Sequence, residues 1–268
     1  MNIIIKKSES LMRYLMVHHL SEVIPLYIVN EYPKSGGTWV SQMLARALNV
    51  PFPQNRFPSL RSSIMQGHYL NPNGMKNIVV VWRDGRDIMV SWYYHCLFKH
   101  DCGKNAALVD IVSNDLKFKN PEDIRNNLPI FIEYSFTKQR HPRFSWTDFV
   151  HQWYQHPGII SVRYESLHKN AVSQLQRVVW ELTGKDLEVE TAIKIVEEFS
   201  FVRQSGRKPG EIKINSFLRK GVVGDWQNHF SQEACEVFNH FAGNELITLG
   251  YENDTTWVNS KGIKIAMK

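Results

Sequence analysis

A glycine-rich segment between an apolar run and a helical pattern has the composition of an anion-binding loop. The segment Tyr32–Trp39 contains two adjacent glycines and follows the apolar residues 26–29. Glycines let the backbone come close to an anion, and the N–H groups at a helix start point toward it. Lys34 adds a positive charge, while Ser35 and Thr38 add hydroxyl groups. The segment is therefore predicted to bind a group of phosphate size.

The order of residues in this loop argues against an ordinary ATPase or GTPase. In the signature G-x-x-x-x-G-K-[ST] the lysine follows the second glycine, whereas Lys34 precedes Gly36 and Gly37. A P-loop nucleotide or small-molecule kinase would also need an acidic ligand for Mg²⁺. Such a kinase stays as an alternative function that the motif opposes.

Two further segments combine basic residues with glycines or a helix start. Arg83 follows the apolar run 78–82, and Ser91 lies about two turns inside the helix predicted to come next. Residues 219–226 open with a basic pair that is followed by glycines. Together with the glycine-rich loop, these segments predict three basic anion sites at one edge of a sheet.

The three segments, in this order, resemble motifs of the cytosolic-type sulfotransferases, which use 3'-phosphoadenosine 5'-phosphosulfate (PAPS). Residues 33–39 resemble the family's 5'-phosphosulfate loop, P-K-S-G-T-T-W. Residues 83–91 resemble its 3'-phosphate site, R-x-x-x-D-x-x-x-S, and residues 219–226 resemble its R-K-G-x-x-G-D-W signature. The resemblance covers residues 26–240 and implies a bacterial small-molecule sulfotransferase. Its reaction would move the sulfuryl group from PAPS to a hydroxyl or amine, without a metal, and leave 3'-phosphoadenosine 5'-phosphate (PAP).

The resemblance also implies which residues bind the cofactor. Lys34 and the N–H groups of residues 35–38 would stabilise the charge that grows on the leaving phosphate, so Lys34 is a predicted catalytic residue. Trp39 and Phe201 match the aromatic pair that sandwiches adenine, and Tyr164 matches a base-contacting tyrosine. The implied 3'-phosphate ligands are Arg83, Ser91, Arg219, Lys220 and Gly221. The implied cofactor-binding residues are therefore Lys34, Ser35, Gly36, Gly37, Thr38, Trp39, Arg83, Ser91, Tyr164, Phe201, Arg219, Lys220 and Gly221.

The acceptor must lose a proton during sulfuryl transfer, and a histidine is suited to take it near neutral pH. His68, in residues 66–70, falls where the family's K-T-H-L-P motif has its catalytic histidine. The resemblance therefore implies His68 as the general base. His95 is the main competitor, because it lies about one turn after Ser91 on the same predicted helix.

Two positions depart from the family pattern. Gly37 replaces the first threonine of the loop, which removes a hydroxyl but leaves the N–H, so we expect the anion site to survive. Gln66 replaces the lysine two residues before the histidine and removes a cation near the transferred group. Residues 227–236 match the family's dimer motif, K-x-x-x-T-V-x-x-x-E, poorly, so the oligomeric state is left open.

Strand-like and helix-like patterns alternate along the chain, which predicts an α/β fold. Each apolar run is followed by a loop and a helix, and this order is typical of a doubly wound parallel sheet flanked by helices. The resemblance implies the P-loop-like sulfotransferase fold, and 268 residues with 43% hydrophobic content suit one domain, residues 1–268. The predicted strands are 26–31, 78–82 and 159–163, and the predicted helices are 38–48, 87–98, 170–182, 188–199 and 231–241, the last with Ser231 as N-cap.

The polar, aromatic-rich stretch 97–153 lacks a clear period and is predicted to form loops and short helices that cover the substrate. Its aromatic and acidic side chains would suit a small-molecule acceptor that is aromatic or cationic. Phenols, sterols and sugars remain open as acceptors. The aromatic candidates are Phe118, Phe131, Tyr134, Phe136, Phe144, Trp146 and Phe149, and the acidic ones are Asp101, Asp110, Glu133 and Asp148.

The charge, the cysteines and the hydropathy limit the partners of the chain. A net charge of +6 is modest, and the need to bind an anionic cofactor explains it without nucleic acid. A non-catalytic basic module for nucleic acid or lipid stays as a second alternative, and no apolar run reaches about 18 residues. The odd set Cys96, Cys102 and Cys235 indicates a reducing, cytoplasmic setting. The spacing of Cys96 and Cys102 is not that of a zinc site, so no metal is expected.

Overall fold

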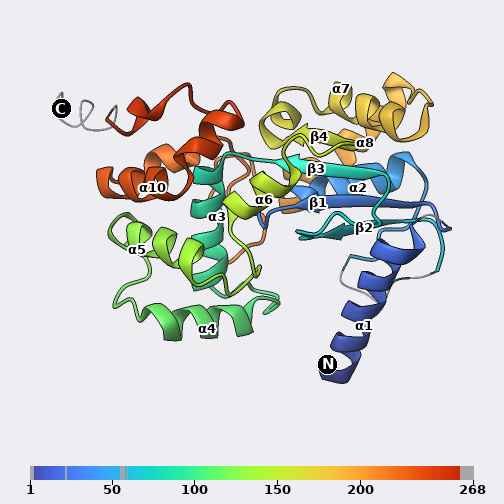
Figure 1. Cartoon of the computed structure of the whole chain (residues 1–268). Helices are drawn as coiled ribbons and strands as arrows, with labels where there is room; N and C mark the ends of the chain where they lie inside the picture. Colours follow the sequence, from blue (N-terminus) through green and yellow to red (C-terminus); the bar gives the residue numbers. More distant parts are fainter. Residues whose placement is uncertain (1–2, 22, 55–57, 59, 260–268) are drawn as a thin grey trace. The chain divides into compact units, whose positions relative to one another are not determined.

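The computed structural model describes residues 3–21, 23–54, 58 and 60–259, and its strands form one parallel sheet. The strand order is β2-β1-β3-β4, as Figure 1 shows. All three strand pairs are parallel, so the predicted α/β class with a parallel sheet is confirmed. The strands are β1 (Leu26–Glu31), β2 (Ser63–Gly67), β3 (Ile78–Trp82) and β4 (Ile159–Arg163).

The register of the sheet brings the strand ends to one edge. Asn30 is paired with Gly67, Glu31 with Val81, and Trp82 with Arg163. Because the strands are parallel, the residues that follow them leave the sheet on the same side. Those residues open the glycine-rich loop after β1 and include His68, Arg83 and Tyr164 after the other three strands.

Within the described ranges, the chain forms two compact units. The sheet belongs to the first unit, which falls within residues 1–83 and 155–204. Its helices are α1 (Ile3–Leu15), the π-helical η1 (Met16–Leu20), α2 (Gly37–Ala47), α7 (Tyr164–Thr183), α8 (Val189–Glu198) and the short α9 (Phe201–Ser205). The second unit falls within residues 84–154 and 205–268, so one domain over residues 1–268 stays a prediction.

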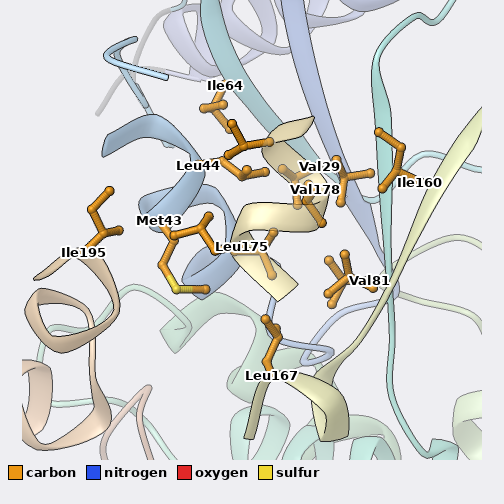
Figure 2. Close-up of a cluster of buried hydrophobic side chains, with 14 of the residues drawn as sticks. Val29, Met43, Leu44, Ile64, Val81, Ile160, Leu167, Leu175, Val178 and Ile195 are labelled. Atoms are coloured by element: carbon orange, nitrogen blue, oxygen red, sulfur yellow. The ribbon is translucent and has the colours of Figure 1, made fainter. Parts of the chain in front are cut away.

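An apolar cluster holds the sheet of the first unit against its helices. Strand residues such as Val29 and Val81 are fully buried, as is typical of the apolar strands of a parallel sheet. Met43 and Leu44 of α2 and Leu175 of α7 pack against them (Figure 2). This cluster fixes the directions in which the segments after the strands leave the sheet.

The second unit is helical in its described part and has its own core. Its elements are α3 (Gly85–Leu97), α4 (Ala106–Leu116), α5 (Ile124–Thr137), α6 (Trp146–Trp153), the 3₁₀ helices η2 (Asp225–Asn228) and η3 (Thr255–Val258), and α10 (Gln232–Thr248). Trp146, Phe149, Phe230 and Phe238 are at most 1% exposed and fill the interior of this unit. Ser231 caps α10 as predicted, since its side chain accepts a hydrogen bond from the Ala234 N–H.

The stretch 97–153 contains more helix than its sequence predicted. Between its loops, the structure has three helices here: α4, the 14-residue α5 and α6. The prediction was misled because Pro129 lies inside α5 and because aromatic residues mask the helical period. Five of the seven aromatic candidates are core residues that are at most 8% exposed: Phe131, Phe136, Phe144, Trp146 and Phe149.

Strand β2 and the start of α7 also differ from the sequence-based expectation. Strand β2 was not predicted, and α7 begins at Tyr164, six residues before the predicted start, with a non-helical Asn170 inside it. Among the described helices, none is long and apolar enough to span a bilayer.

Candidate active site

The glycine-rich loop leaves β1 through two left-handed residues before α2 begins. Lys34 has a φ of 74° and Gly36 has a φ of 100°. A Cβ added to Gly36 would lie 2.6 Å from Cδ2 of Tyr164. Gly36 is therefore required both by its backbone conformation and by the aromatic ring packed on it.

Arg83 and Tyr164 lie beside this loop in the first unit. Arg83 donates from Nη1 to the backbone oxygen of Lys34 over 2.9 Å, and its guanidinium lies 4.2 Å from the centre of the Tyr164 ring. The Trp39 and Tyr164 rings meet edge to face at 6.1 Å. Four predicted site residues are thus brought together, while half-buried Phe201 stands at the start of α9.

A carboxylate that the sequence analysis missed reaches into the loop. Glu31, the last residue of β1, accepts a hydrogen bond from the Gly37 N–H through Oε2 over 2.6 Å. The Ser35 N–H also has a partner in the chain, the Tyr32 carbonyl oxygen at 3.2 Å. Two of the N–H groups expected to face an anion are therefore engaged. An acidic residue directly before a predicted anion loop was the available signal for Glu31.

His68 lies directly after β2 and is held by the end of β1. Its Nδ1 lies 2.9 Å from the backbone carbonyl oxygen of Glu31. A carbonyl can only accept, so Nδ1 carries the proton in this hydrogen bond. In a neutral imidazole with this tautomer, the other ring nitrogen, Nε2, carries the lone pair that can accept a proton.

Ser91 and Arg219 are related through Tyr94 in the second unit. Ser91 is half-buried on α3, and Tyr94 follows it by three residues on the same helix face. The guanidinium of Arg219 lies 4.5 Å from the centre of the Tyr94 ring. Arg219 therefore packs on a tyrosine that lies about one turn after Ser91 on α3.

Asp225 binds both basic residues of the third motif, residues 219–226. It accepts from Nη2 of Arg219 over 2.6 Å and from Nζ of Lys220 over 2.5 Å. Burial alone would raise the pKa of Asp225, but hydrogen bonds from His229, Lys220 and Arg219 outweigh it and hold the pKa far below its usual range. The buried Nε and Nη1 of Arg219 have no hydrogen-bond partner in the part of the chain that the structure describes. These two donors fit an anionic ligand.

Asp87 fixes the backbone of the same motif. Its Oδ2 accepts from the Gly224 N–H over 2.7 Å, and its Oδ1 accepts from the Trp226 N–H over 2.9 Å. Gly221 and Gly224 have φ values of 65° and 77°, which glycine adopts without strain. The sequence shows Asp87 and Asp225 only as fixed positions of the motifs. The partners of Asp87 lie more than a hundred residues away, and the salt bridges of Asp225 to Arg219 and Lys220 leave no periodic pattern.

His95, the competing base, lies in a ring cluster of the second unit. It stacks on Trp92 at a centroid distance of 5.1 Å, and its Nδ1 lies 3.3 Å from Nε2 of buried His100. Within the described ranges, no three or more His, Cys, Asp and Glu side chains are grouped to hold a metal ion.

Comparison with known proteins assigns the chain to a family. The sulfotransferase domain model matches residues 49–250, and the chain belongs to that family. The matched range contains His68, Arg83 and the third motif, whereas the glycine-rich loop precedes it. The predicted sulfotransferase membership is confirmed.

Curated relatives and solved structures agree with this assignment. Sulfotransferase 1E1 of Cavia porcellus is 25% identical over 79% of this chain and 80% of its own length. Amine sulfotransferase of Oryctolagus cuniculus is 26% identical over 80% of this chain and 78% of its own length. Mouse sulfotransferase SULT7A1, solved in complex with PAP, has a similar fold, with a TM-score of 0.60, 22% identity and coverage of 83% of this chain and 85% of that one.

Proposed function

We propose that this sulfotransferase moves the sulfuryl group of PAPS to a hydroxyl or amine of a small-molecule acceptor. One observation carries the proposal: a single sheet edge bears the glycine-rich loop, His68, Arg83 and Tyr164. This is the edge of a parallel sheet at which α/β proteins bind their ligands. Family membership supports sulfuryl transfer as the reaction class.

The residues of the glycine-rich loop fit the phosphosulfate end of PAPS. Gly36 lets the Tyr164 ring pack directly on the backbone of the loop, because a Cβ there would lie 2.6 Å from the ring. Lys34 and the hydroxyls of Ser35 and Thr38 would hold the 5'-phosphosulfate. When bound, PAPS supplies an activated sulfuryl group and leaves as PAP.

PAPS carries a 3'-phosphate that ATP lacks, so its site needs hydrogen-bond donors that ATP would leave without a partner. Arg219 has two buried donors, Nε and Nη1, for which the described residues offer no acceptor. Each of them can donate to an anionic ligand, and Lys220 and Ser91 would add further donors. Arg83 and the backbone at Gly221 complete the proposed 3'-phosphate ligands, while Trp39, Phe201 and Tyr164 would contact adenine.

His68 is the proposed general base. Its Nδ1–H is fixed on the Glu31 carbonyl, so Nε2 is the nitrogen that would take the proton of the acceptor. Lys34 would stabilise the charge on the departing phosphate. This division of roles needs no metal ion from the protein.

The acceptor is proposed to be a small molecule, either aromatic or cationic. The name of one relative, amine sulfotransferase, supports an amine as one option. Of the aromatic candidates in residues 97–153, Phe118 and Tyr134 are not in the core, and Tyr134 donates to Asp115 over 2.8 Å. These two side chains are the better candidates for contact with an acceptor.

A mass-spectrometric screen tests the function. The protein is incubated with PAPS and a library of phenols, alcohols, sterols, sugars and amines, and products heavier by one sulfuryl group are sought. The proposal predicts such a product from wild-type protein and none from His68→Ala. Wild-type protein that binds PAP but sulfates no member of any class, amines included, would count against a small-molecule acceptor.

A further inference from the structure

The buried carboxylate of Glu31 has no role in the machinery described so far. Its residue is only 4% exposed, and both carboxylate oxygens have donors. Oε2 accepts from the Gly37 N–H over 2.6 Å, and Oε1 accepts from Nε2 of Gln66 over 2.7 Å. Hydrogen bonds to a buried carboxylate are strong, so Glu31 ties the loop to the segment that carries His68.

The space around Gly37 is filled by Glu31. A Cβ added to Gly37 would lie 2.5 Å from Cδ and 2.6 Å from Oε1 of Glu31. Gly37 is not among the residues with a positive φ, so its backbone would accept a side chain. The obstacle to the threonine that the related loops carry is therefore the Glu31 side chain.

Gln66 matches the same carboxylate. A carboxylate only accepts, so the Gln66 amide must turn Nε2 toward Glu31. Its Oε1 then lies 3.2 Å from the Thr38 hydroxyl, which can donate to it. A lysine at position 66 would offer donors to Glu31 but no acceptor to Thr38. The glycine and the glutamine, both unusual for the family, are thus explained by one side chain.

We propose that Glu31 is a positioning residue that fixes the backbone of the phosphosulfate loop at Gly37 and, through Gln66, the side chain of Thr38, and that Glu31, Gly37 and Gln66 are coupled. The inference rests on the proposed function, because it assumes that this loop binds the cofactor. A carboxylate beside the loop also repels the anionic ligand. Glu31 therefore lowers the affinity for the cofactor while it fixes the position of the loop.

A double-mutant cycle tests the coupling. Gly37→Thr, Glu31→Ala and the double variant are compared by melting temperature and by calorimetric titration with adenosine 3',5'-bisphosphate, which is PAP. Gly37→Thr alone is expected to lower the melting temperature and to weaken binding by about tenfold or more, because the new side chain meets Glu31. In the Glu31→Ala background the same change should cost little in either measurement. Equal losses in the two backgrounds would overturn the coupling.

Removal of the Glu31 charge tests whether the carboxylate weakens binding of the anionic ligand. Glu31→Gln keeps an oxygen that accepts from the Gly37 N–H, and the Gln66 amide can rotate so that its oxygen accepts from the new amide at position 31. The variant is expected to bind the bisphosphate about tenfold more tightly at low salt, with a lower kcat and a melting temperature close to that of the wild type. The control Glu198→Gln removes an equal charge from an exposed ion pair of the first unit and should leave affinity and kcat unchanged.

The outcomes separate this inference from the proposed function. A purely structural Glu31 would give a lower melting temperature in Glu31→Gln with unchanged affinity and kcat, and would overturn the positioning role alone. Wild-type protein that does not bind the bisphosphate would overturn the proposed function and, with it, the role of Glu31 toward the cofactor. The melting temperatures of the double-mutant cycle would still decide whether Glu31 and Gly37 are coupled.

Discussion

His68 donates a hydrogen bond from Nδ1 to the backbone carbonyl oxygen of Glu31 over 2.9 Å. This contact orients the His68 ring, which follows β2, against the end of β1. The glycine-rich loop begins directly after β1. A change in the path of residues 31–38 would therefore move the proposed base together with the proposed anion site. Loop and base are expected to respond to mutation as one structure.

The first prediction concerns the base. His68→Ala should lower turnover by about 10² to 10⁴, because general base catalysis is lost, while adenosine 3',5'-bisphosphate still binds. Steady-state rates with one acceptor at fixed pH, together with calorimetry, provide the check. His95→Ala, in the ring cluster of the second unit, serves as the comparison and should keep most of the activity. A dead His95→Ala beside an active His68→Ala would show that the base is misassigned.

The second prediction separates two cations of the cofactor site. Lys34→Ala should lower kcat by about 10² to 10³, because Lys34 acts on charge that grows during the reaction. Arg219→Ala should mainly raise the KM for PAPS, because its unsatisfied donors would hold the 3'-phosphate in both the ground state and the transition state. Full kinetics at varied PAPS concentration distinguish the two patterns. Exposed Arg125→Ala on α5 is a charge-matched control. If both site variants keep kcat and only raise KM, the loop binds without catalysing.

Much of the sheet could be predicted from sequence, since β1 and β3 contain continuous apolar runs and β4 has three apolar residues among its five. Strand β2 could not, because Ser63–Gly67 is short and only Ile64 and Met65 in it are apolar. A strand of this kind is defined by its pairing with β1, which a local pattern does not show.

The sequence predicted site residues that the family resemblance names directly. It did not predict the roles of residues that act by holding another side chain or backbone group. Arg83, Tyr164 and Lys34 do meet in the structure, as the order of the motifs implied. Glu31 and Asp225 act by hydrogen bonds to other motif residues, so their roles appear only with coordinates. Side chains that position others leave no periodic signal in the sequence.

The third prediction tests the packing of the loop on Tyr164. Gly36→Ala places a methyl group within 2.6 Å of the ring and forces a side chain into a φ of 100°. The free energy of unfolding should fall by about 2 to 4 kcal/mol, from backbone strain and overpacking together. Gly103→Ala is the matched control: its φ is also positive, at 65°, but a Cβ there would meet nothing within 4 Å. Its cost should be about 1 kcal/mol. Equal costs in urea denaturation would show that Tyr164 does not press on the loop.

The fourth prediction concerns the pH dependence of stability. The folded-state pKa of Asp225 lies below its unfolded value, so its contribution to stability is present above about pH 4 and is lost as pH falls toward the folded pKa. Asp225→Asn should lower the unfolding free energy by about 3 kcal/mol at pH 7, because two half-buried cations lose their buried counter-charge. The difference from wild type should shrink below about pH 4.

Urea titrations at pH 7, 5 and 3.5 would measure this difference. Asp110→Asn is the control, because the Asp110–Lys99 pair is more than half exposed and such pairs contribute about 0 to 1 kcal/mol. A difference between wild type and Asp225→Asn that stays constant or grows as the pH falls would mean that the ionised carboxylate is not what stabilises the third motif.

Calorimetric titration of the wild-type protein with adenosine 3',5'-bisphosphate, ADP, and ATP with Mg²⁺ tests the central claim most directly. The Nε and Nη1 donors of Arg219 gain a partner only with the bisphosphate, and each charged hydrogen bond is worth about 1.5 to 3 kcal/mol. The bisphosphate should therefore bind about 10²-fold more tightly than ADP, with no need for Mg²⁺. Equal affinities for the three ligands, or tighter binding of ATP with Mg²⁺, would contradict a PAPS-dependent sulfotransferase.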